Sequence, residues 1–423
     1  MRTFFTSPAH WKPRKWLFWI HLYTGLAVGL LALVVGLSGA ALVYLPEIEG
    51  TAHQATAPVA RAMPLGELAR GVLEHYPGFE IEDVRFNTAG DVVELQIQKA
   101  ERGKGKQKAR LPGTDLRLAV DPETGAVVQV IDRRAGVWGF LRDLHHNLLA
   151  GKTGRMVNGI GALALLLLCM TGAVIWWPGP RLWKQRAMIQ RGTTWKRFNW
   201  DLHHAGGFWL AVGLAFFAFT GVEYGFPEAT RGVLYSVTGG VARAKKPHGT
   251  VEKGRQADLA LVVKQAQAAV PDGHIARIRM PEKASEPFEV RMKTAFDGRE
   301  QGNNKVFVDR ATGEVILVDR FDRLSLASRA IDLLGPLHNA RFMTLNQMSV
   351  VLRLPWILFG LAPGMFFITG FLMWWNRVVS KKWTALLQPA ADMPARTGRA
   401  RQWVRVAGIA AAMLLAARWI WAE

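Results

Sequence analysis

The chain contains four apolar runs that are long enough to cross a lipid bilayer, and they constrain its fold more than any other feature. The runs cover Trp16–Tyr44, Met156–Trp177, Phe208–Phe226 and Val350–Trp375. An α-helix rises about 1.5 Å per residue, so each run crosses roughly 30 Å of hydrocarbon. Aromatic residues typical of membrane interfaces cluster at the run ends: Trp16, Tyr44, Trp176, Trp177, Tyr224, Trp374 and Trp375. The sequence therefore predicts an integral membrane α-helical bundle.

Basic residues in the short flanks of these runs predict the orientation. They precede the first run, crowd the connection between the second and third runs, and follow the fourth: Arg14, Lys15, Arg181, Lys184, Arg186, Arg191, Lys196, Arg197, Arg377, Lys381 and Lys382. Cytoplasmic flanks are enriched in Lys and Arg, so we expect this side in the cytoplasm and the long segments 46–136 and 227–330 outside it. The first run lacks an A-x-A-like cleavage site and is interpreted as a retained span.

Net charge and cysteine content limit the classes of binding partner and metal site that the chain can have. Much of the net charge of +20 lies in the membrane flanks, so we expect a lipid bilayer and no nucleic acid as partner. Cys169 is the single cysteine, which excludes a disulfide framework and a thiolate metal cluster. A fifth apolar run, Val406–Trp421, is short and interrupted by Arg418. Whether it spans the membrane stays open.

One pattern of histidine and helix occurs twice. The motifs LSG at Leu37–Gly39 and FTG at Phe219–Gly221 are offset by 182 residues, and the same offset places His21 opposite His203. His145 and His338 each follow a leucine just before the second and fourth runs. Their offset of 193 differs from the 198 between the TG motifs of those runs, and we assign the difference to a loop at GKTGR after His145. The pattern predicts an internal two-fold repeat.

The two segments between the runs also match each other. Each begins with an amphipathic helix, at 65–77 and 259–271, and continues with alternating strands and a hairpin at 116–132 and 305–319. We expect two small antiparallel sheets, each packed by one helix. The segments Gly103–Arg110 and Asp297–Lys305 are predicted to be exposed loops. The first is basic, and either solvation or contact with an anionic ligand accounts for its charge.

The hairpins carry a D-x-x-T-G-x-V motif at Asp121–Val127 and Asp309–Val315, and the LH-containing spans end in TG and WW. In these motifs the segments resemble PepSY domains and the spans resemble PepSY-associated transmembrane proteins, over about residues 14–380. Within that family the chain is similar to the di-haem (FoxB-like) ferrisiderophore reductases of the bacterial inner membrane.

The spans and the PepSY-like segments give the predicted domain boundaries. These are 1–45 for the N-terminal segment and first span, 46–136 for one periplasmic α+β PepSY-like domain, 137–178 for the LHH segment and second span, 179–198 for a cytoplasmic loop, 199–226 for the third span, 227–330 for the other PepSY-like domain, 331–376 for the LH segment and fourth span, and 377–423 for a cytoplasmic segment with the fifth run.

The four repeated histidines are the candidate site residues. A histidine in a membrane segment is costly unless it is paired or bound, and imidazole is a common axial ligand of haem iron. We expect His21 with His203 near the cytoplasmic face and His145 with His338 near the outer face, holding two haem b groups, since no C-x-x-C-H motif is present. Helix neighbours point about 100° apart, so His146 and His204 are alternates to His145 and His203. Glycines beside the inner pair would leave room for a flat macrocycle: Gly25, Gly29, Gly206, Gly207 and Gly213.

Several other residues are weaker candidates. Arg142, Asn147, Asn339 and Arg341 would anchor haem propionates or are ordinary flank residues. Met156, Met343 and Met348 are interpreted as packing residues, and Glu47 and Glu223 as rim residues. Four histidines without metal-ligand spacing are assigned to the surface: His53, His75, His248 and His274.

The resemblance implies an oxidoreductase that reduces ferric siderophore iron in the periplasm with electrons from an unidentified cytoplasmic or membrane donor. Spacing alone supports only electron transfer across the membrane. No strand-linked G-x-G-x-x-G motif occurs, so no flavin or nicotinamide domain is expected in this chain. One alternative is a non-enzymatic membrane regulator that binds or inhibits a protease. An iron transporter is a third reading, although the first three spans have no charge in their middles.

Overall fold

The computed structural model describes residues 8, 11–48, 63–86, 92–99, 112–190, 194–252, 257–295, 301–340 and 350–380. The chain divides into two units, residues 1–371 and Leu372–Glu423. In the second unit, the described residues continue α13 and form η4 (Asn376–Ser380), where the Asn376 side chain donates to the Leu372 carbonyl at 2.8 Å. The fifth apolar run, 406–421, lies outside the described residues.

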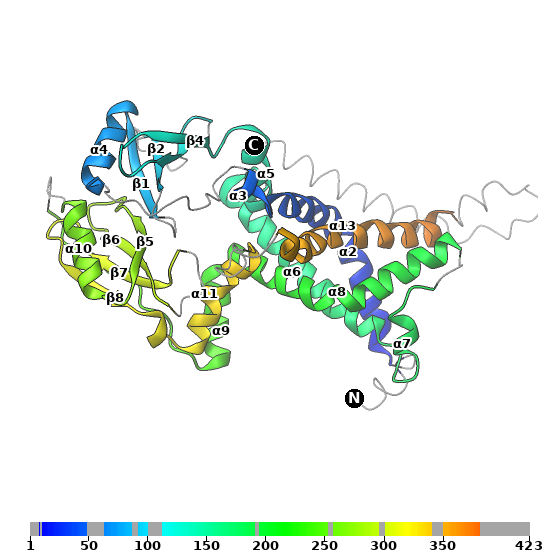
Figure 1. The fold of residues 1–423 in the computed structure, drawn as a ribbon. Helices are drawn as coiled ribbons and strands as arrows, with labels where there is room; N and C mark the ends of the chain where they lie inside the picture. Colours follow the sequence, from blue (N-terminus) through cyan, green and yellow to red (C-terminus); the bar gives the residue numbers. More distant parts are fainter. Residues whose placement is uncertain are drawn as a thin grey trace, which may run out of the picture. The chain divides into compact units, whose positions relative to one another are not determined.

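Four described helices are long and apolar enough to cross a membrane: α2 (Pro13–Leu42), α6 (Gly151–Trp176), α8 (Trp195–Gly225) and α13 (Leu354–Trp375) (Figure 1). They confirm the four predicted spans. Large apolar side chains on them point outward, among them Val212 and Leu30, which are 82% and 58% exposed. Lipid tails would cover such a surface, and water would not. Helix α8 begins at Trp195, earlier than the apolar run, so His203 lies well inside it.

Glycines allow the spans to approach closely. A Cβ atom on Gly36 of α2 would collide with the Gly360 carbonyl oxygen of α13. A Cβ atom on Gly159 of α6 would lie 2.9 Å from the Gly225 Cα atom of α8. Small residues at helix crossings are typical of membrane bundles, where packing supplies much of the association energy.

The described residues of each segment outside the spans contribute one packing helix and four strands to the sheet, in the predicted order. The first contains α4 (Leu65–His75), β1 (Phe79–Phe86), β2 (Val93–Lys99), β3 (Asp115–Val120) and β4 (Val127–Asp132). The second contains α10 (Leu259–Ala269), β5 (His274–Arg279), β6 (Phe288–Lys293), β7 (Asn304–Val308) and β8 (Val315–Asp319). In both hairpins an aspartate caps the turn: Asp121 Oδ1 accepts from the Glu123 N–H at 2.8 Å, and Asp309 Oδ1 from the Ala311 N–H at 2.7 Å.

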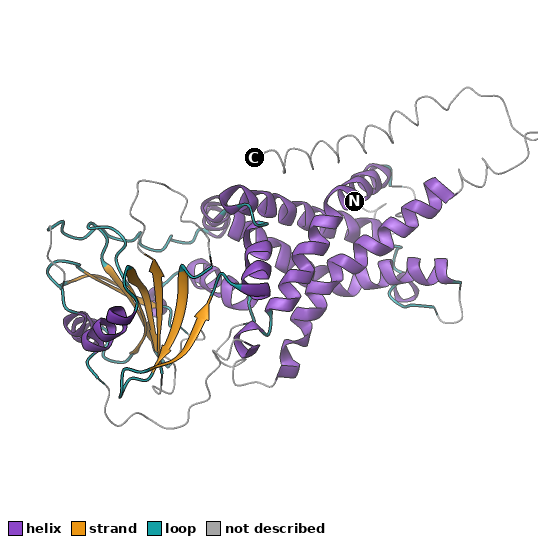
Figure 2. Cartoon of the chain, turned by 90° about the horizontal axis from the view of Figure 1, so that it is seen from above, coloured by secondary structure: helices purple, strands orange, loops and turns teal. Residues whose placement is uncertain are grey.

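The prediction of two separate sheets is wrong. The described strands, orange in Figure 2, form one antiparallel eight-stranded sheet. Their order is β4-β3-β2-β1-β5-β6-β7-β8, so the two segments join where β1 pairs with β5. Separate four-stranded sheets would each leave a first-strand edge unpaired, and such edges pair readily. The buried Asp83 carboxylate holds this seam, because it accepts from Arg85 Nε at 2.9 Å and Arg277 Nε at 2.7 Å.

One hydrophobic core runs under the whole sheet. Helices α4 and α10 contact each other on the same face, and their Val72 and Val262 side chains pack in one cluster with Leu95 of β2 and Val290 of β6. Alternate strand residues point to the opposite face, which is rich in charge. Asn303 and Asn304 are buried, and Asn304 begins β7, so these two residues are not part of an exposed loop as predicted. Lys305 lies in β7, as the predicted hairpin 305–319 requires.

Short elements connect the sheet and the spans: α3 (Leu45–Ile48), α5 (Gly136–Asn147), α7 (Trp183–Arg186), α9 (Pro227–Thr238), η2 (Phe321–Arg323), α11 (Leu326–His338) and η3 (Val350–Arg353). The predicted loop at GKTGR is instead the first turn of α6. The chain breaks just before it, where Leu148 and Leu149 adopt φ of 51° and 62°. A Cβ atom on Gly154 would collide with the Asn147 carbonyl, so glycine permits this tight junction.

Candidate functional site

His21 and His203 face each other between α2 and α8. Each lies eight residues after the first residue of its helix. Their ring centroids are 6.4 Å apart and the ring planes are nearly perpendicular, at 88°. The structure therefore brings together two half-buried imidazoles that are 182 residues apart in the chain.

His145 and His338 form a second pair between α5 and α11. Their ring centroids are 6.2 Å apart with an angle of 45° between the planes. Burial lowers the pKa of His338 to about 3 and also lowers the pKa of His145, so both imidazoles are neutral at neutral pH. A neutral imidazole is the form that binds a metal ion.

These separations suit two imidazoles that share one metal ion. An imidazole nitrogen lies about 2 Å from a bound metal ion, so ring centres on opposite sides of the ion are roughly 6 Å apart. Both observed separations, 6.4 and 6.2 Å, meet this requirement. Two imidazoles are also a donor set that iron in a porphyrin accepts.

A hydroxyl group from another helix contacts each imidazole at Nδ1. The Nδ1···Oγ1 distance is 3.0 Å for His21 and Thr171, 2.9 Å for His203 and Thr369, and 2.7 Å for His338 and Thr220. Nδ1 of His145 lies 2.9 Å from the Val35 carbonyl oxygen and 3.4 Å from Ser38 Oγ.

These contacts determine which ring nitrogen can bind a metal. Each threonine hydroxyl donates its hydrogen to a carbonyl of its own helix, at 2.8 Å for Thr171 to Leu167 and 2.8 Å for Thr369 to Met365. The hydroxyl oxygen must then accept from the imidazole Nδ1–H. The remaining nitrogen, Nε2, carries a lone pair, and a second hydrogen bond of this kind is typical of metal-binding histidines.

The two imidazole pairs are separated along the spans. Ser38 follows His21 by seventeen residues in α2, and Thr220 follows His203 by seventeen residues in α8. Because Ser38 and Thr220 contact the other imidazole pair, the pairs lie about 25 Å apart along these helices. That is most of a hydrocarbon core of roughly 30 Å, so the pairs lie near opposite membrane faces.

Glycines after the hydroxyl residues make room for the imidazoles. A Cβ atom on Gly39 would lie 2.6 Å from His145 Cε1, and one on Gly172 would lie 3.1 Å from His21 Cε1. The glycines predicted to leave space for a macrocycle play another part at three positions. Gly29, Gly206 and Gly213 face Phe367, Met365 and Phe359 of α13, because close helix packing fills the space that they leave.

The two histidine doublets differ in which member faces a partner. His203 faces His21, whereas the His204 ring stacks on Trp200 at 3.8 Å and its Nδ1 contacts the carbonyl of that residue. His145 faces His338, whereas His146 is exposed. Geometry therefore favours His145 and His203 as site residues over His146 and His204.

A known protein family matches most of the chain. The family described as PepSY-associated TM region matches residues 18–377, which include all four spans and both imidazole pairs. The chain belongs to this family. A search of curated proteins gave no match to the sequence. Membership of the PepSY-associated family accounts for the membrane-spanning helices, and the chemistry depends on the residues of the site.

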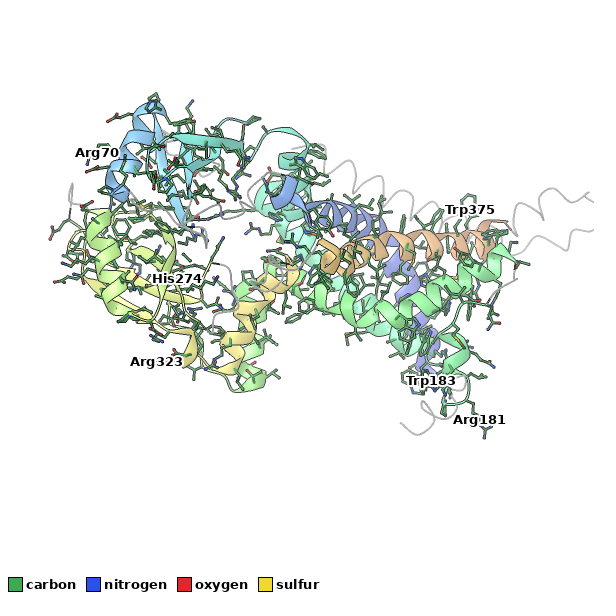
Figure 3. All side chains as sticks on the ribbon, viewed as in Figure 1. Arg70, Arg181, Trp183, His274, Arg323 and Trp375 are labelled. Atoms are coloured by element: carbon green, nitrogen blue, oxygen red, sulfur yellow. The ribbon has the colours of Figure 1, made fainter. Side chains whose placement is uncertain are left out.

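Positive charge gathers where α6 connects to α8. Arg186 donates to the Trp176 carbonyl at 3.2 Å, and burial together with nearby Arg14 and Arg197 lowers its pKa. The guanidinium groups of Arg186 and Arg197 also lie 5.4 and 4.9 Å from the Trp200 ring centre. Arg181 and Trp183 lie in the same connection between α6 and α8 (Figure 3). This cluster can receive an anionic group at the end of the spans that holds His21 and His203.

The other predicted site residues do not join the imidazole pairs. Arg142 donates to the Arg133 carbonyl at 2.7 Å, Asn147 is buried, and Asn339 ends α11. Met156 is exposed, and Glu223 is buried in an ion pair with Arg231 at 2.6 Å. His75, His248 and His274 are exposed, as expected, and His274 begins β5 (Figure 3). His53, Arg341, Met343, Met348, segment 103–110 and the Glu47 side chain lie outside the described residues.

Sequence reasoning missed the four hydroxyl residues: Ser38, Thr171, Thr220 and Thr369. Their signal is the serine or threonine before glycine near the end of every span. We used these dipeptides only to align the two halves, although two of them follow a candidate histidine at the same distance.

Proposed function

We propose that this protein is an oxidoreductase of the bacterial inner membrane that carries electrons from the cytoplasmic side to ferric siderophore iron in the periplasm. Two haem b groups would bind it, one between His21 and His203 and one between His145 and His338. The sheet of PepSY-like segments would lie in the periplasm, and the connection with Arg181 and Lys184 in the cytoplasm.

One observation carries the proposal. Two pairs of imidazoles have ring separations of 6.4 and 6.2 Å, and each ring is tethered at Nδ1, which leaves Nε2 for a ligand. Packing alone does not require that all four histidines repeat this arrangement. A buried polar ring needs one hydrogen bond to be satisfied, and a free Nε2 facing a second imidazole would be costly without a shared ligand.

The chain supplies position, insulation and charge. Haem, when bound, supplies reversible one-electron chemistry at its iron. The hydroxyl tethers would hold each imidazole in the tautomer and orientation that present Nε2. The spans exclude water between the two sites, and the cations Arg14, Arg186 and Arg197 would compensate anionic propionates near the inner pair.

The overall reaction balances without a proton. A donor on the cytoplasmic side loses one electron, and one ferric ion on the other side becomes ferrous. Siderophores hold ferric iron through hard oxygen donors, which bind ferrous iron less tightly, so reduction promotes release. The siderophore substrate rests on the family resemblance.

The proposal is tested by the absorption spectrum of the purified full-length protein. We expect reducible bands of two b-type haems, of which His21→Ala removes the inner one and His338→Ala the outer one. His75→Ala is the matched control, because that histidine is exposed on α4 and should leave both bands unchanged.

Two results would contradict the proposal. If the folded protein stays colourless when it is expressed with ample haem, it does not bind haem and the proposal is refuted. If the colourless protein also bound a protease specifically, the non-enzymatic regulator would be the better reading.

A further inference from the structure

Four cations lie side by side across the centre of the sheet. The strand registers pair Arg85 of β1 with Arg277 of β5, Arg277 with Arg291 of β6, and Arg291 with Lys305 of β7. Their sequence neighbours, among them Ile278, are buried in the core, so the four side chains project from the face opposite α4 and α10. We call Arg85, Arg277, Arg291 and Lys305 the cation row.

Ion pairs between described residues reach three of the four cations. Like charges directly opposite each other destabilise a sheet, so each needs compensation. Asp83 pairs with both Arg85 and Arg277, and Glu289 pairs with Arg291 at 3.0 Å. Lys305 forms no ion pair with any residue that the structure describes. Among the described residues, Asp83 and Glu289 are thus the carboxylates that form ion pairs with the row.

The surroundings of Lys305 disfavour its positive charge. Burial, followed by the charges of Arg243 and Arg291, lowers the pKa of Lys305 to about 8. A protein that needed only a stable sheet would gain by a neutral residue at this position. A positive charge that is unfavourable for the fold indicates that Lys305 contributes to binding an anionic ligand.

We propose that the cation row binds a small polyanion, and that this ligand is a ferric chelate whose oxygen donors leave it with net negative charge, as carboxylate or catecholate donors do. This inference rests on the proposed function, which it deepens by assigning a substrate class. The arginine forks and the lysine would bind the outer oxygens of the chelate while its iron stays complexed.

The ends of the row limit the size of the ligand. In register, Arg85 faces Glu94 of β2 and Lys305 faces Asp319 of β8, so an acidic residue closes each end. Neighbouring strands are about 4.8 Å apart, which makes the row roughly 14 Å long. A compact chelate fits this length, whereas an extended polyanion or a lipid surface would meet the acidic ends.

The arginines are accessible but held in place. The side chains of Arg85, Arg277 and Arg291 are 18%, 20% and 18% exposed, and each is fixed by a carboxylate. A ligand that reaches them loses little side-chain entropy on binding, so preorganisation favours affinity.

The test measures binding without electron transfer. Gallium(III) citrate is the probe, because gallium(III) resembles ferric iron in charge and size but is not reduced under these conditions. Its affinity for the full-length protein in detergent is measured by calorimetry. We expect Lys305→Gln and Arg291→Gln each to weaken binding about tenfold. Lys264→Gln, on the exposed side of α10 at the opposite face, should leave binding unchanged.

A second ligand and salt complete the design. A neutral gallium tris-hydroxamate should bind at least tenfold more weakly than the citrate complex, and added salt should weaken citrate binding. Unchanged affinity in both row variants, equal binding of the neutral chelate, or an equal loss in Lys264→Gln would each overturn the proposal. If Arg291→Gln misfolds because Glu289 is left unpaired, Lys305→Gln alone decides the question.

The result separates this inference from the proposed function. Gallium binding that depends on the row, in a protein that takes up no haem, would uphold the row and refute the electron path. A protein that binds both haems but does not bind gallium citrate would uphold the electron path and refute ligand binding by the cation row.

Discussion

The Nδ1 atom of His203 lies 2.9 Å from Oγ1 of Thr369, a residue 166 positions away in the chain. Because the threonine hydroxyl already donates to the Met365 carbonyl at 2.8 Å, it accepts from the imidazole and fixes the tautomer. The imidazole is thereby oriented before any ligand arrives. The same relationship holds between His21 and Thr171.

We predict that Thr369→Val weakens haem binding at the inner site by about 10- to 100-fold, because valine keeps the shape but removes the acceptor. Titration of the protein with haem measures the affinity, and the reduction potential of the inner site should shift with it. Thr369→Ser should restore both. A valine variant with wild-type affinity and potential would show that the tether has no role in ligation.

We predict that Gly39→Ala displaces the His145 ring and empties the outer site. A Cβ atom there would lie 2.6 Å from His145 Cε1, which is closer than unstrained contacts allow. The ratio of haem to protein should fall from two to one while the inner spectrum is retained. Gly71→Ala on α4 is the control, since no atom lies within 4 Å of the new methyl group.

We predict that the stability difference between the wild type and Lys305→Gln depends on pH. The pKa of Lys305 is lowered to about 8 in the fold, so below that pH the folded protein carries an unfavourable charge. Between about pH 8 and 10 the unfolded chain binds more protons, so the wild type gains stability with rising pH relative to the variant. Thermal melting from pH 7 to 10 tests the sign. A constant difference would refute it.

We predict that Asp83→Ala opens the junction of β1 and β5 and destabilises the protein by about 2 kcal/mol, because two guanidinium groups lose a buried carboxylate. Partial exposure of the arginines keeps the cost below that of a fully buried pair. Denaturation should show the loss, and hydrogen exchange should increase in β1 and β5. Asp272→Ala removes an exposed partner of Arg320 and should change little.

Local sequence patterns were sufficient for part of this structure. Apolar length predicted the four spans, and alternation with Asp and Gly turns predicted the strands around Asp121 and Asp309. Each of these features depends on residues close together in the chain. The repeat spacing also led to the pairs that the structure brings together, His21 with His203 and His145 with His338.

Long-range contacts were beyond the same patterns. The tether of His338 is Thr220, 118 residues away, and nothing near either residue indicates the other. The pairing of β1 with β5 depends on two edges meeting, so it was predicted as two sheets. Lys305 stood at the border of two predictions, as the last residue of the loop Asp297–Lys305 and the first of the hairpin 305–319, and it lies in β7.

The sheet seam and both imidazole pairs each take one member from residues before 150 and one from residues after 200. Each part of the chain thus behaves like one subunit of a dimer whose partner is covalently attached. Association no longer depends on protein concentration, and the two contributions are always present in equal number. Neither contribution has to resemble the other closely, so His145 can use a backbone carbonyl where His338 uses a hydroxyl, which a true homodimer could not arrange.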